Sequence, residues 1–464
     1  MPNFDYQDGR LIWRGNYETI QIESWGRDSL RVRAISGLEI RDGLPSALLE
    51  PTPTESQVEI SEERAIIRNG AITGEIHPGG DRFDTGIQPV IRILKRATGT
   101  ELLAEAPAYF PRPPARHYRS VGGDLFQIQM RFKAYDGERL YGLGQHQHGL
   151  LDQKGAVIDL IQYNSEVSIP FLLSNRGYGF LWNNPAVGRV ELGQNQTRWI
   201  ADATPQMDYW VTVGDTPAVI MAQYADATGH APSFPEWAAG FWQCKLRYRT
   251  QEELLEVARE YKRRGLPLSV IVIDFFHWTK QGEWQFDLAC WPDPMGMVHE
   301  LEEMGVKVMV SIWPTVNPTC SNFEEMQRRG LLTRAERGVS AMMLFTDTGF
   351  EGPAYMHYYD PTNPEARRFI WERAREGYYR HGIKVWWLDA CEPETRHEDP
   401  GNLRYYLGNG AAVGNIYPLM HERAFYEGMI AEGENEIITL CRSAWAGSQR
   451  YAAALWSGDI RSTF

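Results

Sequence analysis

The sequence predicts an α/β protein in which an incomplete (β/α)8 barrel follows an antiparallel β-sandwich. Residues 1 to about 235 form a succession of short segments that alternate apolar and polar side chains, as strands do. From residue 236 onward, apolar strands alternate with amphipathic helices, which is the pattern of parallel βα units. Nearly every one of these later strands ends in aromatic and charged residues, as at the carboxyl-end face of a barrel.

The first expected domain covers residues 1–235 and consists of strands and turns. Segments such as 30–37 (LRVRAISG) and 126–134 (FQIQMRFKA) alternate apolar and polar residues. Gly, Pro or Asp separates these segments, and no helical period persists. Because this alternation buries one face of each strand, we expect antiparallel strands packed as a β-sandwich.

The second expected domain covers residues 236–464. Thr250 should cap a helix that runs through Gly265, with Glu253 completing a capping box. The expected strands are 240–245, 268–275, 306–313, 383–388, 436–441 and 452–456, and the other expected helices are 294–304, 364–380 and 418–431. An open doubly wound sheet alternates in the same way, but no GxGxxG or GxxxxGK(S/T) segment follows a strand. The pattern therefore favours a (β/α)8-type barrel.

Six strands are two fewer than a complete barrel of this type contains. At roughly 31 residues per βα unit, two more units need on the order of 60 residues beyond Phe464. We therefore expect a chain that is cut short at its C-terminus. The segment 315–362 is too long for a simple βα loop and is expected to form an excursion over the site.

Composition and charge favour a neutral substrate such as a sugar. The chain contains 16 Trp and 22 Tyr, whose flat faces and polar edges suit stacking against sugar rings. Acidic residues outnumber Lys and Arg by 60 to 47, which gives a formal net charge of −13. This excess of negative charge argues against a nucleic acid partner, because a phosphate backbone would be repelled.

No metal site, cofactor or membrane segment is expected. The five cysteines, at 244, 290, 320, 391 and 441, form no CxxC or Cys/His spacing. His146 and His148 share a Gly-rich loop, but no third ligand follows at a recognisable spacing. The N-terminus lacks the pattern of a signal peptide, and no apolar run reaches 18 residues. We therefore expect a cytoplasmic protein, and we leave open whether it forms a homo-oligomer.

The segment 384–394 (KVWWLDACEPE) is the main candidate for a catalytic strand end. Its apolar run stops at Asp389, and Glu392 and Glu394 follow. Asp459 lies 459 − 389 = 70 residues further on, also at a strand end, so the two aspartates are expected to face each other across the barrel mouth. Paired carboxylates beside tryptophans are suited to glycoside hydrolysis, in which one attacks the anomeric carbon and the other protonates the leaving oxygen.

Other strand ends supply groups that suit substrate binding. Arg442 would keep a carboxylate ionised or bind a sugar hydroxyl, and Asp274 would accept hydrogen bonds from hydroxyls. The tryptophans at these strand ends, which we assign to substrate binding, are Trp313, Trp387 and Trp456. A buried Asp–Arg pair is often purely structural, but such groups on several successive strand ends favour a site.

At these residues the chain resembles glycoside hydrolase family 31, the retaining α-glycosidases. The family's nucleophile segment resembles Trp387-Leu388-Asp389 followed by Glu392-Pro393, and its acid/base segment resembles Trp456-Ser457-Gly458-Asp459. The resemblance implies that Asp389 is the nucleophile, Asp459 the acid/base and Glu392 a supporting group. It also places the substrate-binding residues of the family at Arg442 and Asp274, and the Tyr-Gly-Leu-Gly-Gln-His segment of its galactose-mutarotase-like N-terminal domain at residues 141–146.

The resemblance implies hydrolysis of terminal non-reducing α-glycosidic bonds by a retaining double displacement. The partner would be an oligosaccharide or α-glycoside. We favour an α-xylosidase, because the bulky residues 275–278 (FFHW) would fill the space that a hexose hydroxymethyl group needs. An α-glucosidase or α-galactosidase stays open. The family's substrate-binding His is expected on the last barrel strand, beyond Phe464.

Two other classes of function are weighed against a glycosidase. One is a non-catalytic carbohydrate-binding protein that uses the same tryptophans. The other is a thiol enzyme built on Cys391. Neighbouring carboxylates would raise the pKa of that thiol, and no His lies at an evident partner position, so we do not favour it.

Overall fold

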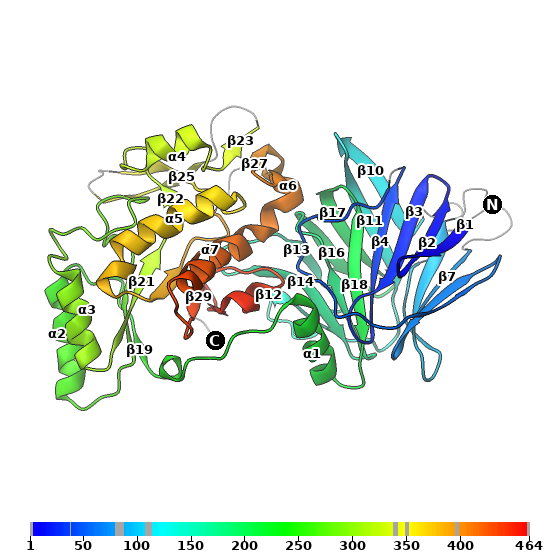
Figure 1. Cartoon of the computed structure of the whole chain (residues 1–464), viewed down its shortest axis with the longest axis horizontal. Helices are drawn as coiled ribbons and strands as arrows, with labels where there is room; N and C mark the ends of the chain where they lie inside the picture. The colour runs from blue at the N-terminus through cyan, green and yellow to red at the C-terminus, as the bar shows by residue number, and fades with distance from the viewer. Residues whose placement is uncertain are drawn as a thin grey trace. The chain divides into compact units, whose positions relative to one another are not determined.

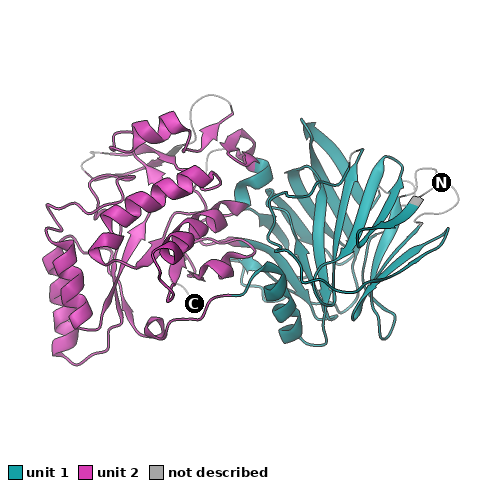
Figure 2. Ribbon diagram, viewed as in Figure 1, with its two compact units in different colours: residues 1–161, 168–230, 411–415 teal, residues 162–167, 231–410, 416–464 magenta. Residues whose placement is uncertain are grey.

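The computed structural model describes residues 3–37, 39–78, 88–106, 114–336, 342–348, 352–394 and 399–461. The chain divides into two compact units (Figure 2). Unit 1 comprises residues 1–161, 168–230 and 411–415, and unit 2 comprises residues 162–167, 231–410 and 416–464. Two short segments, 162–167 and 411–415, therefore belong to a different unit from the residues that flank them in the sequence.

Unit 1 is built from antiparallel sheets, as the sequence predicts (Figure 1). The sheets have the strand orders β1-β2-β3-β4-β18-β15-β14-β12, β10-β11-β17-β16-β13 and β5-β6-β7-β8-β9. Their strands are β1 (Asn3–Gln7), β2 (Arg10–Gly15), β3 (Glu18–Ser24), β4 (Ser29–Ser36), β5 (Gln57–Ile60), β6 (Ala65–Asn69), β7 (Ile72–Pro78), β8 (Pro89–Lys95), β9 (Thr100–Ala104), β10 (Arg116–Gly122), β11 (Leu125–Lys133), β12 (Leu140–Gln145), β13 (Val157–Leu160), β14 (Val167–Ser174), β15 (Tyr178–Trp182), β16 (Gly188–Leu192), β17 (Gln196–Thr204) and β18 (Met207–Val213).

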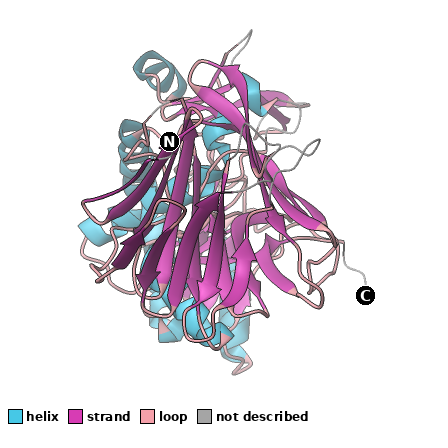
Figure 3. Cartoon of the chain, turned by 90° about the vertical axis from the view of Figure 1, so that its right-hand side faces the viewer, coloured by secondary structure: helices cyan, strands magenta, loops and turns pink. Residues whose placement is uncertain are grey.

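The burial of each strand follows its place in the sheet. In β11 every second residue is buried, including Ile128, Met130 and Phe132, which join the core of this unit. All seven residues of β18 are buried, and this strand lies inside its sheet, where it pairs with β4 and β15. The long strands lie side by side in Figure 3. The unit also contains helix α1 (Pro217–Thr228), whose first turn is capped by the Thr216 side chain.

Unit 2 is organised around a curled parallel sheet of six strands, as the sequence predicts. The order is β19-β20-β21-β26-β29-β30, so each strand lies beside the next one along the chain. The sheet is open, with β19 and β30 at its edges among the described residues. Its strands are β19 (Trp242–Gln243), β20 (Val270–Ile273), β21 (Lys307–Ile312), β26 (Val385–Leu388), β29 (Thr439–Cys441) and β30 (Ala453–Leu455).

Helices follow the parallel strands along the chain. They are α2 (Gln251–Arg263), α3 (Pro294–Glu303), α5 (Pro364–Gly377) and α7 (Tyr417–Ala431). Thr250 caps α2 by accepting a hydrogen bond from Glu253 N at 3.2 Å. The expected capping box is only partly correct, because the Glu253 carboxylate accepts from Arg249 N at 2.7 Å, one residue before the cap. In this position the Glu253 carboxylate also forms an ion pair with Lys245.

Short elements occupy the segment between β21 and α5 and the segment after β26. These are β22 (Thr315–Val316), α4 (Phe323–Arg329), β23 (Arg334–Ala335), β24 (Met342–Phe345), β25 (Ala354–Tyr358), β27 (Leu403–Tyr405), β28 (Gly408–Asn409) and α6 (Gly410–Val413). The β24 end is held by buried Asp347, which accepts hydrogen bonds from Gln281 N at 3.0 Å and Asn317 Nδ2 at 2.6 Å. None of the helices in the described ranges is long and apolar enough to cross a membrane.

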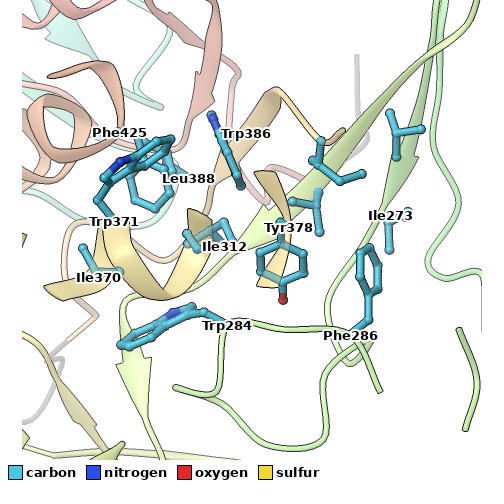
Figure 4. Packing of buried hydrophobic residues seen from close by; sticks show 14 of the residues in the cluster. Ile273, Trp284, Phe286, Ile312, Ile370, Trp371, Tyr378, Trp386, Leu388 and Phe425 are labelled. Atoms are coloured by element: carbon cyan, nitrogen blue, oxygen red, sulfur yellow. The ribbon is translucent and has the colours of Figure 1, made fainter. Parts of the chain in front are cut away.

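The core of unit 2 lies between the parallel sheet and the helices that follow its strands. Trp386 of β26 points into this core beside Trp371 of α5 and Phe425 of α7 (Figure 4), with ring centroids 5.9 and 5.3 Å away. Side chains alternate across a strand, so the next residue, Trp387, points to the opposite face. The Trp-Trp pair therefore joins the core of the unit on one side and the site described below on the other.

Candidate active site

Asp389 and Arg442 lie at equivalent positions on the ends of neighbouring parallel strands. Leu388 of β26 is paired with Cys441 of β29, so the residues that follow them come side by side. Arg442 N donates to the carbonyl oxygen of Leu388 at 3.2 Å, and Asp389 N donates to that of Ile312 at 3.0 Å. These backbone hydrogen bonds therefore fix Asp389 and Arg442 at the carboxyl ends of their strands, where β26 lies between β21 and β29.

The Arg442 guanidinium contacts four carboxylates. Its Nε and Nη2 atoms donate to the two oxygens of Glu392 at 2.7 and 3.1 Å. Its Nη1 atom lies 3.1 Å from Asp389 Oδ1 and 3.7 Å from Asp459 Oδ2, while Nη2 lies 3.4 Å from Glu394 Oε1. A forked, planar cation suits such multiple contacts better than a lysine would. Arg442 therefore ties the acids of two strand ends together.

A cavity of about 700 Å³ opens at these strand ends. It is lined by Asn164, Leu246, Asp274, Phe275, Trp313, Leu344, Phe345, Trp387, Asp389, Glu394, Arg442, Trp456 and Asp459. A volume of this size suits a ligand of one or a few sugar rings. The structure thus brings seven of the sequence-predicted residues to one cavity, and these are Asp274, Trp313, Trp387, Asp389, Arg442, Trp456 and Asp459.

Burial raises the pKa of two acids that line the cavity, Asp389 and Asp274. The side chain of Asp389 is 8 % exposed, and burial raises its pKa to about 7, although the positive charge of Arg442 lowers it. The charge of Glu392 raises the pKa of Asp389 further. Burial likewise raises the pKa of Asp274 to about 6, against the hydrogen bond from Phe275 N at 2.7 Å. Both carboxyl groups therefore titrate close to neutral pH, as groups in catalytic sites often do.

Tryptophans supply hydrogen-bond donors as well as flat surfaces in the cavity. The indole Nε1 atoms of Trp313 and Trp387 are buried and make no hydrogen bond to any residue that the structure describes. Buried donors usually have a partner, so these two are available to a ligand that enters the cavity. Trp387 meets Trp456 edge to face, with ring centroids 5.5 Å apart. The wall therefore combines apolar area with unsatisfied N–H groups, which matches the faces and hydroxyls of a sugar.

Two loops leave the strand ends in strained conformations. Ala390, directly after Asp389, has a φ of 54°, and Phe276, two residues after Asp274, has a φ of 63°. Non-glycine residues in this region cost of order 1–3 kcal/mol each and tend to cluster at functional sites. The strain lets the chain turn sharply while each aspartate stays at its strand end.

Other predicted residues lie away from the cavity wall. Glu392 is buried, bonds to Arg442 and does not line the cavity, which fits support of the arginine and not contact with a ligand. Of the residues 275–278 expected to fill the sugar pocket, only Phe275 lines the cavity. His277 instead bonds to the carbonyl oxygen of Asp274 and to the hydroxyl of Tyr378, both at 2.8 Å, so for this side chain the expectation was wrong.

Cys391 is fully buried, and its surroundings do not suit a nucleophile. Burial raises the pKa of its thiol well above the usual value, and the negative charges of Glu392 and Glu422 raise it further. A thiol must ionise to act as a nucleophile. The alternative of a thiol enzyme is therefore disfavoured by the structure as it was by the sequence.

The sequence did not indicate five residues that line the cavity as members of the site. They are Asn164, Leu246, Leu344, Phe345 and Glu394. The position of Glu394 in the acidic run after Asp389 was a usable signal. Leu344 and Phe345 lie on β24 in the segment 315–362, whose length predicted an excursion over the site without indicating which of its residues reach the cavity. His146 and His148 stack with ring centroids 5.7 Å apart, and the described part of the chain holds no group of three side chains in metal-binding proximity.

Comparison with known proteins places the chain in a family. A model of the TIM-barrel domain of glycosyl hydrolases family 31 matches residues 231–464, and one of the glycosyl hydrolase 31 N-terminal galactose mutarotase-like domain matches residues 19–191. An uncharacterized family 31 glucosidase, ORF2, of Pseudescherichia vulneris is 43% identical over 464 residues, which cover 98% of this chain and 86% of that protein.

Two α-xylosidases are also similar to this chain. α-Xylosidase A of Aspergillus niger is 32% identical over 490 residues, which cover 97% of this chain and 65% of that protein. The crystal structure of a GH31 α-xylosidase from a soil metagenome, complexed with xylose, is 46% identical and superposes with a TM-score of 0.92, covering 99% of this chain and 68% of the other. The chain therefore spans about two thirds of these two proteins. The resemblance inferred from the motifs is confirmed: the chain belongs to glycoside hydrolase family 31.

Proposed function

We propose that this protein hydrolyses terminal α-xylosidic bonds with retention of configuration. The proposal is carried by the arrangement of Asp389 and Asp459, whose carboxylate oxygens lie 3.1 and 3.7 Å from one Nη1 atom of Arg442. These two oxygens are no further apart than the sum of the two distances. That limit is compatible with the spacing of about 5–5.5 Å between the two carboxyl groups of retaining glycosidases.

In the first step Asp389 acts as the nucleophile. One of its oxygens forms a bond to the anomeric carbon while the bond from that carbon to the leaving oxygen breaks. Asp459 transfers its proton to that oxygen, so the aglycone departs as a neutral alcohol. Arg442 favours the charged form of Asp389 before the attack, because its Nη1 atom lies 3.1 Å from Oδ1.

In the second step Asp459 acts as a base. It removes a proton from a water molecule, whose oxygen bonds to the anomeric carbon while the ester bond to Asp389 breaks. Two inversions restore the original configuration. The carboxylate of Asp274 and the indole N–H groups of Trp313 and Trp387 bind sugar hydroxyls during both steps.

Xylose is the favoured sugar for two reasons. Phe275 occupies the wall of the cavity beside Trp313, with ring centroids 5.4 Å apart, and this aromatic pair limits the room for a hydroxymethyl group. Two of the similar proteins also carry the name α-xylosidase. Exclusion of one such group by shape is worth about 1–3 kcal/mol, so activity on α-xylosides should exceed that on α-glucosides by roughly 10- to 200-fold. An α-glucoside is the second candidate substrate, favoured by the name of the P. vulneris relative.

The test compares p-nitrophenyl α-xyloside with the α-glucoside and follows the first sugar released by proton NMR. We expect faster release of xylose, appearing first as the α-anomer. The Asp389→Ala variant should lose turnover, and added azide should restore it by replacing the missing nucleophile. Full activity of Asp389→Ala, or release of the β-anomer first, would contradict the retaining mechanism with this nucleophile.

A carbohydrate-binding protein without turnover is the alternative from another class. The observation that favours it is the exposure of Asp459, whose side chain is 75 % accessible, because a general acid works better in a site that excludes water. Calorimetry with xylose, glucose and isoprimeverose, run beside the rate assay, separates the two. Binding of sugar by a folded protein that releases no product would support the alternative.

A further inference from the structure

The short segment 162–167 approaches the proposed acid/base residue from a distant part of the sequence. It lies along the chain between β13 and β14 of unit 1, but its contacts assign it to unit 2. Gln162 fixes it to the residues that follow Arg442: its Nε2 donates to the carbonyl oxygen of Ala444 at 2.9 Å, and its Oε1 accepts from Ser443 Oγ at 3.0 Å. Both contacts are buried, so the segment has a defined place beside the end of β29.

The tip of this segment is a tight two-residue turn. Tyr163 and Glu166 exchange backbone hydrogen bonds of 3.1 and 3.0 Å, which leaves Asn164 and Ser165 as the turn residues. Ser165 has a φ of 69°, as the second central residue of a type II turn requires. These backbone hydrogen bonds on both sides of the turn fix the position of the Asn164 Cα atom.

Asn164 makes two hydrogen bonds to Asp459. Its Nδ2 donates to Asp459 Oδ2 at 2.6 Å, and its Oδ1 accepts from Asp459 N at 3.2 Å. Asn164 Oδ1 also accepts from Ser165 Oγ at 3.2 Å, which orients the amide so that its NH₂ group faces the carboxylate. The other carboxylate oxygen, Oδ1, accepts no hydrogen bond from the described residues.

Gly458 permits this contact. It has a φ of 75°, and a Cβ atom at this position would lie 2.7 Å from both the N and Cα atoms of Ser165. Both the backbone conformation and the close approach of the turn therefore require glycine. The Gly of the Trp-Ser-Gly-Asp segment therefore allows the next residue, Asp459, to contact Asn164.

We propose that Asn164 is a positioning residue for Asp459, an inference that rests on the retaining mechanism proposed above. Asp459 Oδ2 already receives the Asn164 amide hydrogen and lies 3.7 Å from Arg442 Nη1. The acidic proton is therefore carried on Oδ1. When the bond from the anomeric carbon to the leaving oxygen breaks, that oxygen takes the bonding electron pair and receives the proton from Oδ1, while Asp389 forms the new bond to carbon.

A role in aiming the proton predicts a loss that depends on the leaving group. Fluoride leaves α-xylosyl fluoride with little help from a general acid, whereas the sugar alcohol of isoprimeverose needs the proton. For Asn164→Ala we expect kcat/KM on isoprimeverose to fall about 10- to 100-fold, part of the 10²–10⁴-fold that a general acid contributes, with less than about a 3-fold change on the fluoride. Asn164→Asp, which replaces the donor with an oxygen, should show the same selectivity.

Three controls separate positioning from structure. Asn195→Ala, the same change at an exposed turn residue in unit 1, should leave both substrates unaffected. Asn164→Ala made in an Asp459→Ala background should cause no further loss, because the group that it positions is already gone. Equal loss on both substrates in Asn164→Ala, or a further loss in the double variant, would overturn the inference.

A second measurement works even where turnover is absent. In protein labelled with ¹⁵N at asparagine side chains, the Asn164 amide proton that donates to Asp459 should resonate downfield, and Asp459→Ala should return it to an ordinary position. An amide signal that Asp459→Ala leaves unchanged would overturn the contact itself. Failure of wild-type protein to release xylose would instead reject the proposed function, so the two failures are distinguishable.

Discussion

Replacing Glu392 with glutamine should move the acidic limb of the pH–rate profile to lower pH. The Glu392 side chain is fully buried and contacts both Nε and Nη2 of Arg442. It does not line the cavity, so the change leaves the surface that meets the substrate intact. Its negative charge is one of the causes that raise the pKa of Asp389 to about 7.

The size of the shift follows from the geometry. Glu392 and Asp389 contact the same guanidinium, so their charges lie roughly 6 Å apart, and at an effective dielectric constant of about 20 they repel by about 3 kcal/mol, or roughly two pKa units. Movement of Arg442 offsets part of this repulsion, so we expect a fall of about one unit. The sign is fixed: removing a negative charge favours ionisation of Asp389, and the ionised form is the nucleophile.

The assay is kcat/KM on an aryl α-xyloside from pH 4.5 to 9. The wild-type rate should rise with a midpoint near 7, where Asp389 ionises, and the Glu392→Gln midpoint should lie near 6. A thermal melt at pH 7.5 checks that the variant is folded, since a buried amide opposite the arginine costs about 1–3 kcal/mol. A midpoint that stays in place or rises would refute the assigned coupling.

Three further substitutions test Glu422, the Trp386–Trp387 pair and Gly458. Burial raises the pKa of Glu422 to about 8. The stability that this protonated side chain contributes is therefore present below the pKa of Glu422 in the unfolded chain and is lost as pH rises through about 8. The Glu422→Gln variant should melt at a higher temperature than wild type at pH 9 but not at pH 4. Trp386→Phe should lower the free energy of unfolding by about 1–3 kcal/mol without changing KM, because Trp386 belongs to the core. Trp387→Phe removes an indole N–H from the cavity, so it should raise KM with little effect on the melting temperature. Gly458→Ala should lower kcat at least 10-fold, because its Cβ displaces the turn at Ser165; unchanged kcat would show that the close contact is not needed.

The parallel strands were predictable because their signals are local. The strands from β20 onward are apolar runs that end abruptly, and the order of the six strands in the parallel sheet of unit 2 follows the order of the chain. Parallel strands align their carboxyl ends at one edge, so the acids and tryptophans at those ends had to meet. Asp274, Asp389 and Arg442 do line one cavity, while their roles in the reaction stay predictions.

The individual residues that close the site were not predictable in this way, although the length of the segment 315–362 predicted an excursion over the site. Asn164 reaches Asp459 across 295 positions in the sequence, and Phe345 arrives on a short strand that pairs with β25. The sequences around Asn164 and Phe345 show no periodicity or motif that distinguishes them from an ordinary turn or strand. Their positions depend on tertiary contacts such as those of Gln162 and Asp347, which no local pattern encodes.

The sequence by itself therefore determined the family, the parallel strand order and the residues at the strand ends, because backbone hydrogen bonding and side-chain alternation are local. Only the tertiary structure decided which acids line the cavity: Glu394 does, whereas Glu392 is buried against Arg442 and does not. It also decided the pKa of Asp389, since that depends on burial and on charges from other strand ends and loops. Burial and long-range charge are properties of the folded chain, so they cannot be read from the residues that carry them.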